Sequence, residues 1–163
     1  MNIRPLQPDE TERVLAAGLG LARLPRDDGS FYLVAWDGDE PVGHAHLALS
    51  DPPELQDVEV LPAHRRRGVA SALTRAAEQE ALARGHAVLT LTVGIANEGA
   101  QALYRALGYR DAGMPPSRVQ GTVKIRTGLI EVDDTLLTWE RDLSISSPLV
   151  RRTGDLNFSK EGP

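Results

Sequence analysis

Residues 55–108 contain one pattern twice: an apolar strand, a turn, and an amphipathic helix that ends at a glycine. Two strands joined through a helix lie parallel in one sheet, and the crossover between them is right-handed. This repeated unit constrains the fold more than any other feature. The strands are expected at 55–60 and 88–93; the helices are expected from Val69 to Arg84 and from Asn97 to the residue before Gly108.

Helical periodicity predicts which faces of these two helices are buried. On the first helix the apolar face is predicted to carry Val69, Ala72, Leu73, Ala76 and Ala83. On the second helix it is predicted to carry Ala100, Leu103, Tyr104 and Leu107.

The rest of the chain predicts antiparallel pairing around this unit. Segments 30–36 and 41–49 flank the turn signal Asp-Gly-Asp-Glu, which is typical of a hairpin. Near the N-terminus, a strand is expected at 2–6, followed by a weak helix whose capping box would be formed by Asp9 and Glu12. Segments 122–130 and 134–143 are expected to form a closing hairpin, and 115–128 is long enough for a lid. The sequence therefore predicts a mixed α/β fold in one domain, 1–143, with a polar tail at 144–163.

Composition excludes several function classes. The 163 residues include no cysteine, which excludes disulfides, thiolate metal sites and a cysteine nucleophile, and fits a cytoplasmic protein. No apolar run approaches the ~20 residues that a membrane-spanning helix needs, so no membrane association is expected. The formal net charge of −5 argues against nucleic-acid binding.

The first strand runs into a basic turn, His-Arg-Arg-Arg-Gly, at 64–68. The turn has two interpretations: a solvated basic loop, or a cradle for an anion. N–H groups at a helix start lack intrahelical acceptors and carry a partial positive charge, and a glycine lets a phosphate approach the main chain. The turn contains neither a Walker lysine nor the three spaced glycines of a dinucleotide-binding loop.

Two motifs together resemble the GCN5-related N-acetyltransferase (GNAT) superfamily. The first is Arg-x-x-Gly-x-Ala at 65–70, and the second is Asn-Glu-Gly-Ala-Gln-Ala-Leu-Tyr-Arg-Ala-Leu-Gly-Tyr at 97–109. The resemblance implies a mostly antiparallel mixed sheet that splays at two parallel strands and is flanked by helices. It also implies transfer of an acetyl group from acetyl-CoA to a primary amine of a small molecule or peptide, by direct attack in a ternary complex and without a metal.

By the same resemblance, the open edge of the first parallel strand would pair with the pantetheine arm, and a strand N–H near Val60 would polarise the thioester carbonyl. The glycine turn would hold the pyrophosphate. Asn97 is either a contact to the CoA arm or the N-cap of its helix, and one side chain can do both. The implied cofactor-binding residues are Val58, Val60, Arg65, Arg66, Arg67, Gly68, Val69, Ala70, Ser71 and Asn97.

Two catalytic residues are implied. Tyr104 matches the tyrosine that protonates the leaving CoA thiolate, although its place on the apolar stripe also fits simple core packing. Glu54, at the start of the first parallel strand, matches a glutamate base that acts through water; it is equally well a surface charge.

His44 and His46 lie two residues apart and therefore share a face of their strand. They could line the acceptor pocket, supply the base, or simply be packed; no third ligand completes a metal site. The resemblance places acceptor specificity in 14–30 and 111–135 and is compatible with a homodimer. A second hypothesis is a non-catalytic acyl-CoA-binding module with the same fold.

Overall fold

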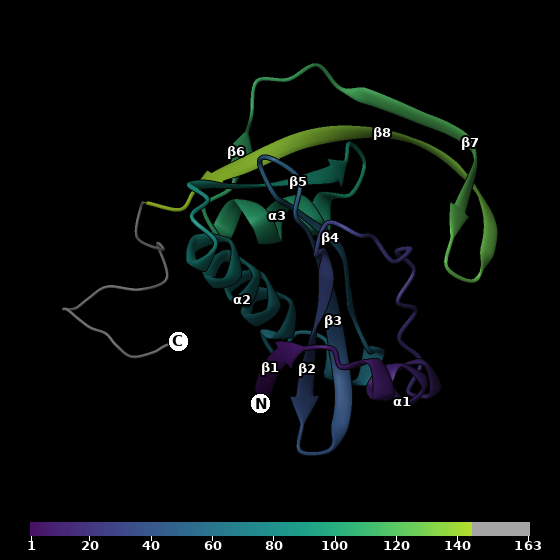
Figure 1. Cartoon of the computed structure of the whole chain (residues 1–163). Helices are drawn as coiled ribbons and strands as arrows, with labels where there is room; N and C mark the ends of the chain where they lie inside the picture. Colours follow the sequence, from purple (N-terminus) through teal and green to yellow (C-terminus); the bar gives the residue numbers. More distant parts are fainter. Residues whose placement is uncertain (145–163) are drawn as a thin grey trace.

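The computed structural model describes residues 1–144, which form one eight-stranded mixed sheet with helices packed on it (Figure 1). The strand order is β1-β2-β3-β4-β5-β8-β6, and β7 pairs with β8 outside this path. Every pair is antiparallel except β4 with β5. The mixed, mostly antiparallel sheet predicted from the sequence is therefore confirmed. The elements are β1 (Asn2–Pro5), a 3-10 helix (Pro8–Glu10), α1 (Thr11–Ala16), β2 (Phe31–Asp37), β3 (Glu40–Ala48), β4 (Glu54–Val60), a second 3-10 helix (Pro62–His64), α2 (Val69–Ala83), β5 (Val88–Gly94), α3 (Glu98–Ala106), β6 (Arg110–Asp111), β7 (Ser117–Ile125) and β8 (Gly128–Asp142).

Strand alternation divides the interior into two cores. On β2, Leu33 and Ala35 pack in the larger core with α2 and α3, whereas Val34 and Trp36 pack in a smaller core with α1. Both faces of the central sheet are thus covered, and the β2 pattern reads as a continuous apolar run.

The crossover from β4 through α2 to β5 is present as predicted, but the two strands diverge early. Their register contains only two pairs, Glu54 with Thr90 and Leu55 with Leu91. From that point β5 stays paired with β8 along its whole length, while β4 stays paired with β3. The sheet is therefore splayed between β4 and β5.

The buried face of α2 differs from the predicted one. Ala83 is exposed, and the buried face includes Thr74 and Glu78. Glu78 can be buried because its carboxylate accepts hydrogen bonds from the Tyr109 hydroxyl at 2.7 Å and from the guanidinium groups of Arg75 and Arg141. A count of apolar residues could not identify Glu78 as buried, because its negative charge is balanced inside the core by two arginines.

Two further sequence expectations are wrong in detail. The N-terminal capping box is formed by Gln7 and Glu10, not by Asp9 and Glu12, because a 3-10 turn begins at Pro8 before the α-helix. The closing hairpin turns inside segment 122–130, between Ile125 and Gly128, so its first strand ends earlier and its second strand begins earlier than expected. The hairpin curls away from the sheet in Figure 1.

No helix within residues 1–144 is long and apolar enough to span a membrane. The predicted tail at 144–163 lies outside the described residues except for Ser144, so the domain boundary stays a prediction.

Candidate active site

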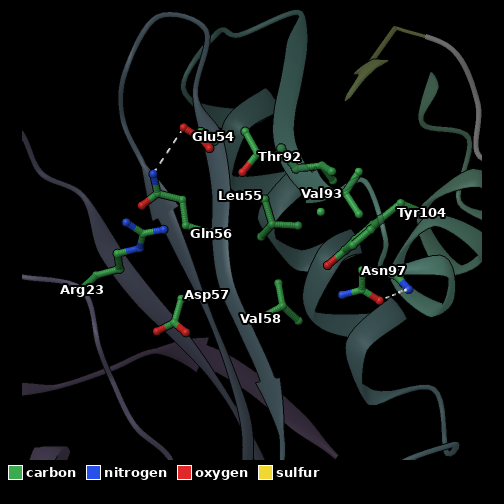
Figure 2. A pocket seen from close by; sticks show the side chains of 13 residues that line it. Arg23, Glu54, Leu55, Gln56, Asp57, Val58, Thr92, Val93, Asn97 and Tyr104 are labelled. Atoms are coloured by element: carbon green, nitrogen blue, oxygen red, sulfur yellow. Dashed lines mark hydrogen bonds between the residues drawn. The ribbon is translucent and has the colours of Figure 1, made fainter. Parts of the chain in front are cut away.

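The splay between β4 and β5 opens a cleft of about 250 Å³ (Figure 2). Side chains from β4, β5 and α3 line it, and Arg23 reaches it from the loop before β2. One edge of β4 thus pairs with β3. The other edge of β4 pairs with β5 only as far as Leu55 and then faces the cleft.

A β-bulge decides which main-chain groups face this cleft. Asp57 and Val58 together oppose Ala45 of β3, and Asp57 has a positive φ of 51°. After the bulge, the Leu61 N–H donates to Val42 on the β3 side. Because alternate residues present their N–H and C=O groups to opposite edges, Val58 and Val60 face the open side. The Val60 carbonyl accepts a hydrogen bond from Nε of Arg65 at 2.9 Å, so this arginine folds back onto its own strand.

The glycine turn has the geometry of an anion site. Gly68 is the N-cap of α2 in the left-handed conformation, with φ 80°, and a Cβ there would meet no atom within 4 Å. The first N–H groups of the 15-residue helix α2, on Val69, Ala70 and Ser71, have no intrahelical acceptor. The turn therefore combines an open approach with free main-chain donors.

Tyr104 of α3 is buried, and its hydroxyl points into the cleft toward β4 (Figure 2). Burial raises the pKa of Tyr104 to about 12, and a hydrogen bond with Thr74 opposes this shift only in part. The phenol is consequently protonated at neutral pH and available as a proton donor.

Asn97 is the N-cap of α3, because its Oδ1 accepts the Ala100 N–H at 3.1 Å. The N-cap interpretation is thereby confirmed. The amide nitrogen of Asn97 lies on the cleft side in Figure 2, so the contact to a CoA arm stays a prediction compatible with the cap.

Glu54, Gln56 and His46 form a hydrogen-bonded chain. The Gln56 amide nitrogen donates to Glu54 Oε1 at 3.3 Å, and the Gln56 amide oxygen lies 3.1 Å from Nδ1 of His46. An amide oxygen only accepts, so Nδ1 carries the hydrogen and Nε2 keeps its lone pair. Burial lowers the pKa of His46, which favours this neutral form.

His44, which the sequence suggested as a residue of the acceptor pocket, lines neither cavity. Its side chain is fully buried, because the loop after α1 covers it. Leu21 N–H donates to Nε2 of His44 at 3.2 Å, and Nδ1 lies 2.9 Å from the Asp57 carbonyl. His46, on the same face, does line the second cavity described next.

A larger groove of about 760 Å³ adjoins the cleft. One wall is the loop 22–26, and the other is one face of the β7–β8 hairpin. The predicted lid segment 115–128 is thus mostly a strand of this wall. Five residues line both cavities and form their junction: Arg23, Glu54, Gln56, Asp57 and Thr92.

Arg126, at the tip of the β7–β8 hairpin, connects the hairpin to the loop of the opposite wall through hydrogen bonds. Its Nε and Nη2 donate to the carbonyls of Leu21 and Gly20 at 2.8 and 3.1 Å, and its N–H donates to Ala22 at 2.8 Å. Asp57 holds the same loop from β4, since its Oδ2 accepts the Tyr32 hydroxyl at 2.6 Å and the Ala22 N–H at 3.2 Å.

Sequence reasoning placed acceptor specificity in 14–30 and 111–135, which include Arg23 and the hairpin, but it did not single out Arg23, Gln56 or Asp57, nor the wall that the hairpin forms. The sequence contains a pattern that indicates the hairpin wall, because Val119, Val123 and Ile125 alternate with polar residues. No sequence pattern indicates the bulge at Asp57, because a bulge depends on how β3 and β4 pair. Within residues 1–144, no three His, Asp or Glu side chains are grouped to hold a metal ion.

The fold matches those of solved acetyltransferases. Nourseothricin acetyltransferase aligns with a TM-score of 0.66 and 21% identity, covering 87% of this chain and 98% of that one. Aminoglycoside 6′-N-acetyltransferase complexed with coenzyme A aligns with a TM-score of 0.63 and 16% identity, covering 91% and 99%. At these identities the likeness establishes the fold class.

Sequence similarity then establishes the family. Residues 3–109 match the Acetyltransferase (GNAT) family, to which the chain belongs. It is 33% identical over 111 residues to N-acetyltransferase 8 of Mus musculus, covering 64% of this chain and 46% of the relative. It is likewise 33% identical over 98 residues to streptothricin acetyltransferase of Streptomyces lavendulae, covering 59% and 52%. The chain spans about half the length of these curated relatives.

Proposed function

We propose that this protein transfers an acetyl group from acetyl-CoA to a primary amine of a small molecule or peptide. The observation that carries the proposal is the open edge of β4, which faces the hydroxyl of Tyr104 and leads to the free N–H groups at the start of α2. Family membership supports it, as does the coenzyme A complex of aminoglycoside 6′-N-acetyltransferase, whose fold is alike.

The residues of this chain fit acetyl-CoA at three places. Val69, Ala70 and Ser71, together with Gly68, would hold the pyrophosphate through main-chain N–H groups. The open main chain of Val58 and Val60 would pair with the amides of the pantetheine arm, as a strand does. Arg66 and Arg67 are exposed and would attract the anion from solvent, whereas Arg65 braces the turn.

Acetyl-CoA supplies the thioester. The neutral amine attacks its carbonyl carbon, a C–N bond forms and the C–S bond breaks. The Val58 N–H would polarise the carbonyl, in place of the N–H near Val60 that the sequence suggested, because Val58 lines the cleft with Tyr104 and Val60 does not. Tyr104 gives its proton to the departing sulfur, a base takes the amine proton, and solvent returns one proton from base to tyrosine. The products are an acetamide and CoA.

Glu54 and His46 are the two candidates to accept the amine proton, and the Gln56 amide is hydrogen-bonded to both. We favour Glu54, acting through water, because it lines both cavities and so lies where thioester and amine meet. His46 lines only the acceptor groove, but its Nε2 lone pair makes it the second candidate.

The test is CoA release by the wild type and Tyr104→Phe with a panel of amines. The phenylalanine lacks the acidic proton, so we expect kcat to fall about 10²-fold with an unchanged Kd for acetyl-CoA. Because the pKa of Tyr104 is about 12, its deprotonation should cause no loss of rate up to about pH 10, where an unperturbed tyrosine titrates.

Two outcomes would contradict the proposal. If acetyl-CoA binds but no amine in the panel gives CoA release, the protein is an acyl-CoA-binding module without transferase activity. If acetyl-CoA does not bind to the folded wild type, the ligand is a different one. Unchanged turnover in Tyr104→Phe would remove Tyr104 alone from the mechanism.

A further inference from the structure

The β7–β8 hairpin presents an apolar face to the groove. Val123 pairs with Ile130 across the hairpin, and Gly121 pairs with Val132, so these residues share one face. Val123 and Ile130 are 36% and 42% exposed, and Leu24 on the opposite wall is 40% exposed. Apolar groups gathered around a groove of this size are typical of a surface that a ligand covers.

The inner end of the groove is charged, and it carries both signs. Glu54 and Asp57 supply two carboxylates at the junction, and Arg23 supplies a guanidinium (Figure 2). Within residues 1–144, the Arg23 side chain forms neither an ion pair nor a hydrogen bond, whereas the neighbouring Arg26 pairs with Asp28 at 2.6 Å. Arg23 is therefore available to a ligand, and a guanidinium favours a carboxylate, which it can bind with two parallel hydrogen bonds.

Resting on the proposed acetyl transfer, we propose that the acceptor is an α-amino acid with a large apolar side chain. Its ammonium lies beside Glu54 and Asp57, next to the thioester cleft, and its carboxylate lies on Arg23. Its side chain extends along the apolar hairpin face, in the groove of about 760 Å³. That volume lies within the ~300–1,000 Å³ range of small-molecule sites.

Two features favour a free amino acid over a polypeptide. Arg126 joins the hairpin tip to residues 20–22 through three hydrogen bonds, which obstruct a chain that would run out between the tip and this loop. An amino acid inside a peptide also lacks the carboxylate that Arg23 would bind.

The test is a calorimetric titration of four probes into the full chain saturated with CoA. The reference probe is 4-phenyl-L-phenylalanine. The others are 2-(4-biphenylyl)ethylamine, which lacks the carboxylate, L-alanine, which lacks the apolar group, and a tripeptide amide that starts with 4-phenyl-L-phenylalanine. We expect the reference probe to bind at least tenfold more tightly than each of the other three.

The Arg23→Gln variant should abolish the preference for the amino acid over the matched amine. The control is Arg118→Gln, which removes an exposed arginine from the hairpin strand β7 outside both cavities and should keep the preference. Thermal melts confirm that both variants are folded.

The proposal is overturned if the amine, alanine or the tripeptide binds as tightly as the amino acid, if none of the four binds, or if Arg23→Gln keeps the preference. The titration is repeated without CoA, so the preference of the groove is measured even if CoA fails to bind. CoA binding without a preference would refute this acceptor and leave acetyl transfer to other amines intact, whereas absent CoA binding would refute the proposed function.

Discussion

Tyr104 and Asn97 reach the cleft from one short helix, and each combines a structural role with a polar atom directed toward the cleft. The Tyr104 ring packs in the larger core while its hydroxyl points at β4. Asn97 caps α3 with its oxygen and leaves its nitrogen on the cleft side. The core-packing and functional interpretations of these residues are therefore compatible, which a pattern of apolar positions alone could not establish.

The proton acceptor can be identified at the residue scale by the pH dependence of kcat. Burial lowers the pKa of His46 from 6.5, so its imidazole is neutral at pH 7 and any loss of rate from its protonation occurs only below pH 6.5. With Glu54 as the base, we expect Glu54→Gln to lower kcat by 10²–10⁴-fold. His46→Gln should lower kcat by less than tenfold and leave the pH dependence of kcat unchanged.

The converse result would reassign the base. If His46→Gln causes the larger loss of kcat and removes a decline of kcat below pH 6.5, the His46 imidazole accepts the proton. Glu54 then orients this imidazole through Gln56. Glu54→Asp serves as the conservative control, since it keeps the charge and shortens the reach.

At the scale of elements, the sequence predicted the crossover well and the hairpin poorly. The crossover follows from local signals: the strand, the glycine turn, the helical period and Gly85. The hairpin turn at 126–127 was missed because segment 122–130 reads as one continuous strand. The groove itself could not be predicted, because it depends on Arg126 meeting carbonyls more than 100 residues earlier in the chain.

Removing the Arg126 hydrogen bonds should open the groove in which we propose that the acceptor binds, without affecting the cleft proposed for acetyl-CoA. In Arg126→Gln the guanidinium no longer bridges Gly20 and Leu21, so we expect KM for the acceptor to rise roughly tenfold, consistent with the loss of charge-assisted hydrogen bonds. The Kd of acetyl-CoA, measured by calorimetry, should stay unchanged.

Arg118→Gln again provides the matched control on the same hairpin and should leave both constants unchanged. An equal rise of the acetyl-CoA Kd and the acceptor KM in Arg126→Gln would mean that the Arg126 hydrogen bonds stabilise the whole fold and have no specific effect on the groove.

On the scale of the whole molecule, one long-range event creates the site: β4 leaves β5 after two paired residues. The divergence opens the main chain of β4, and α2 then places its N-terminus at the glycine turn. The sequence motifs predicted the fold class through resemblance to a family, whereas the extent of the splay depends on β5 pairing with β8 and β4 with β3.

The most direct test is calorimetric titration of acetyl-CoA into the wild type, Gly68→Glu and Gly85→Glu. The two glycines flank α2, both have positive φ, and a Cβ at either meets no atom within 4 Å. Both substitutions therefore carry a similar backbone strain of ~1–2 kcal/mol, but only Gly68→Glu puts bulk and negative charge in the turn. We predict micromolar binding by the wild type and Gly85→Glu and none by folded Gly68→Glu. Equal binding by both variants, or none by the wild type, would contradict the account.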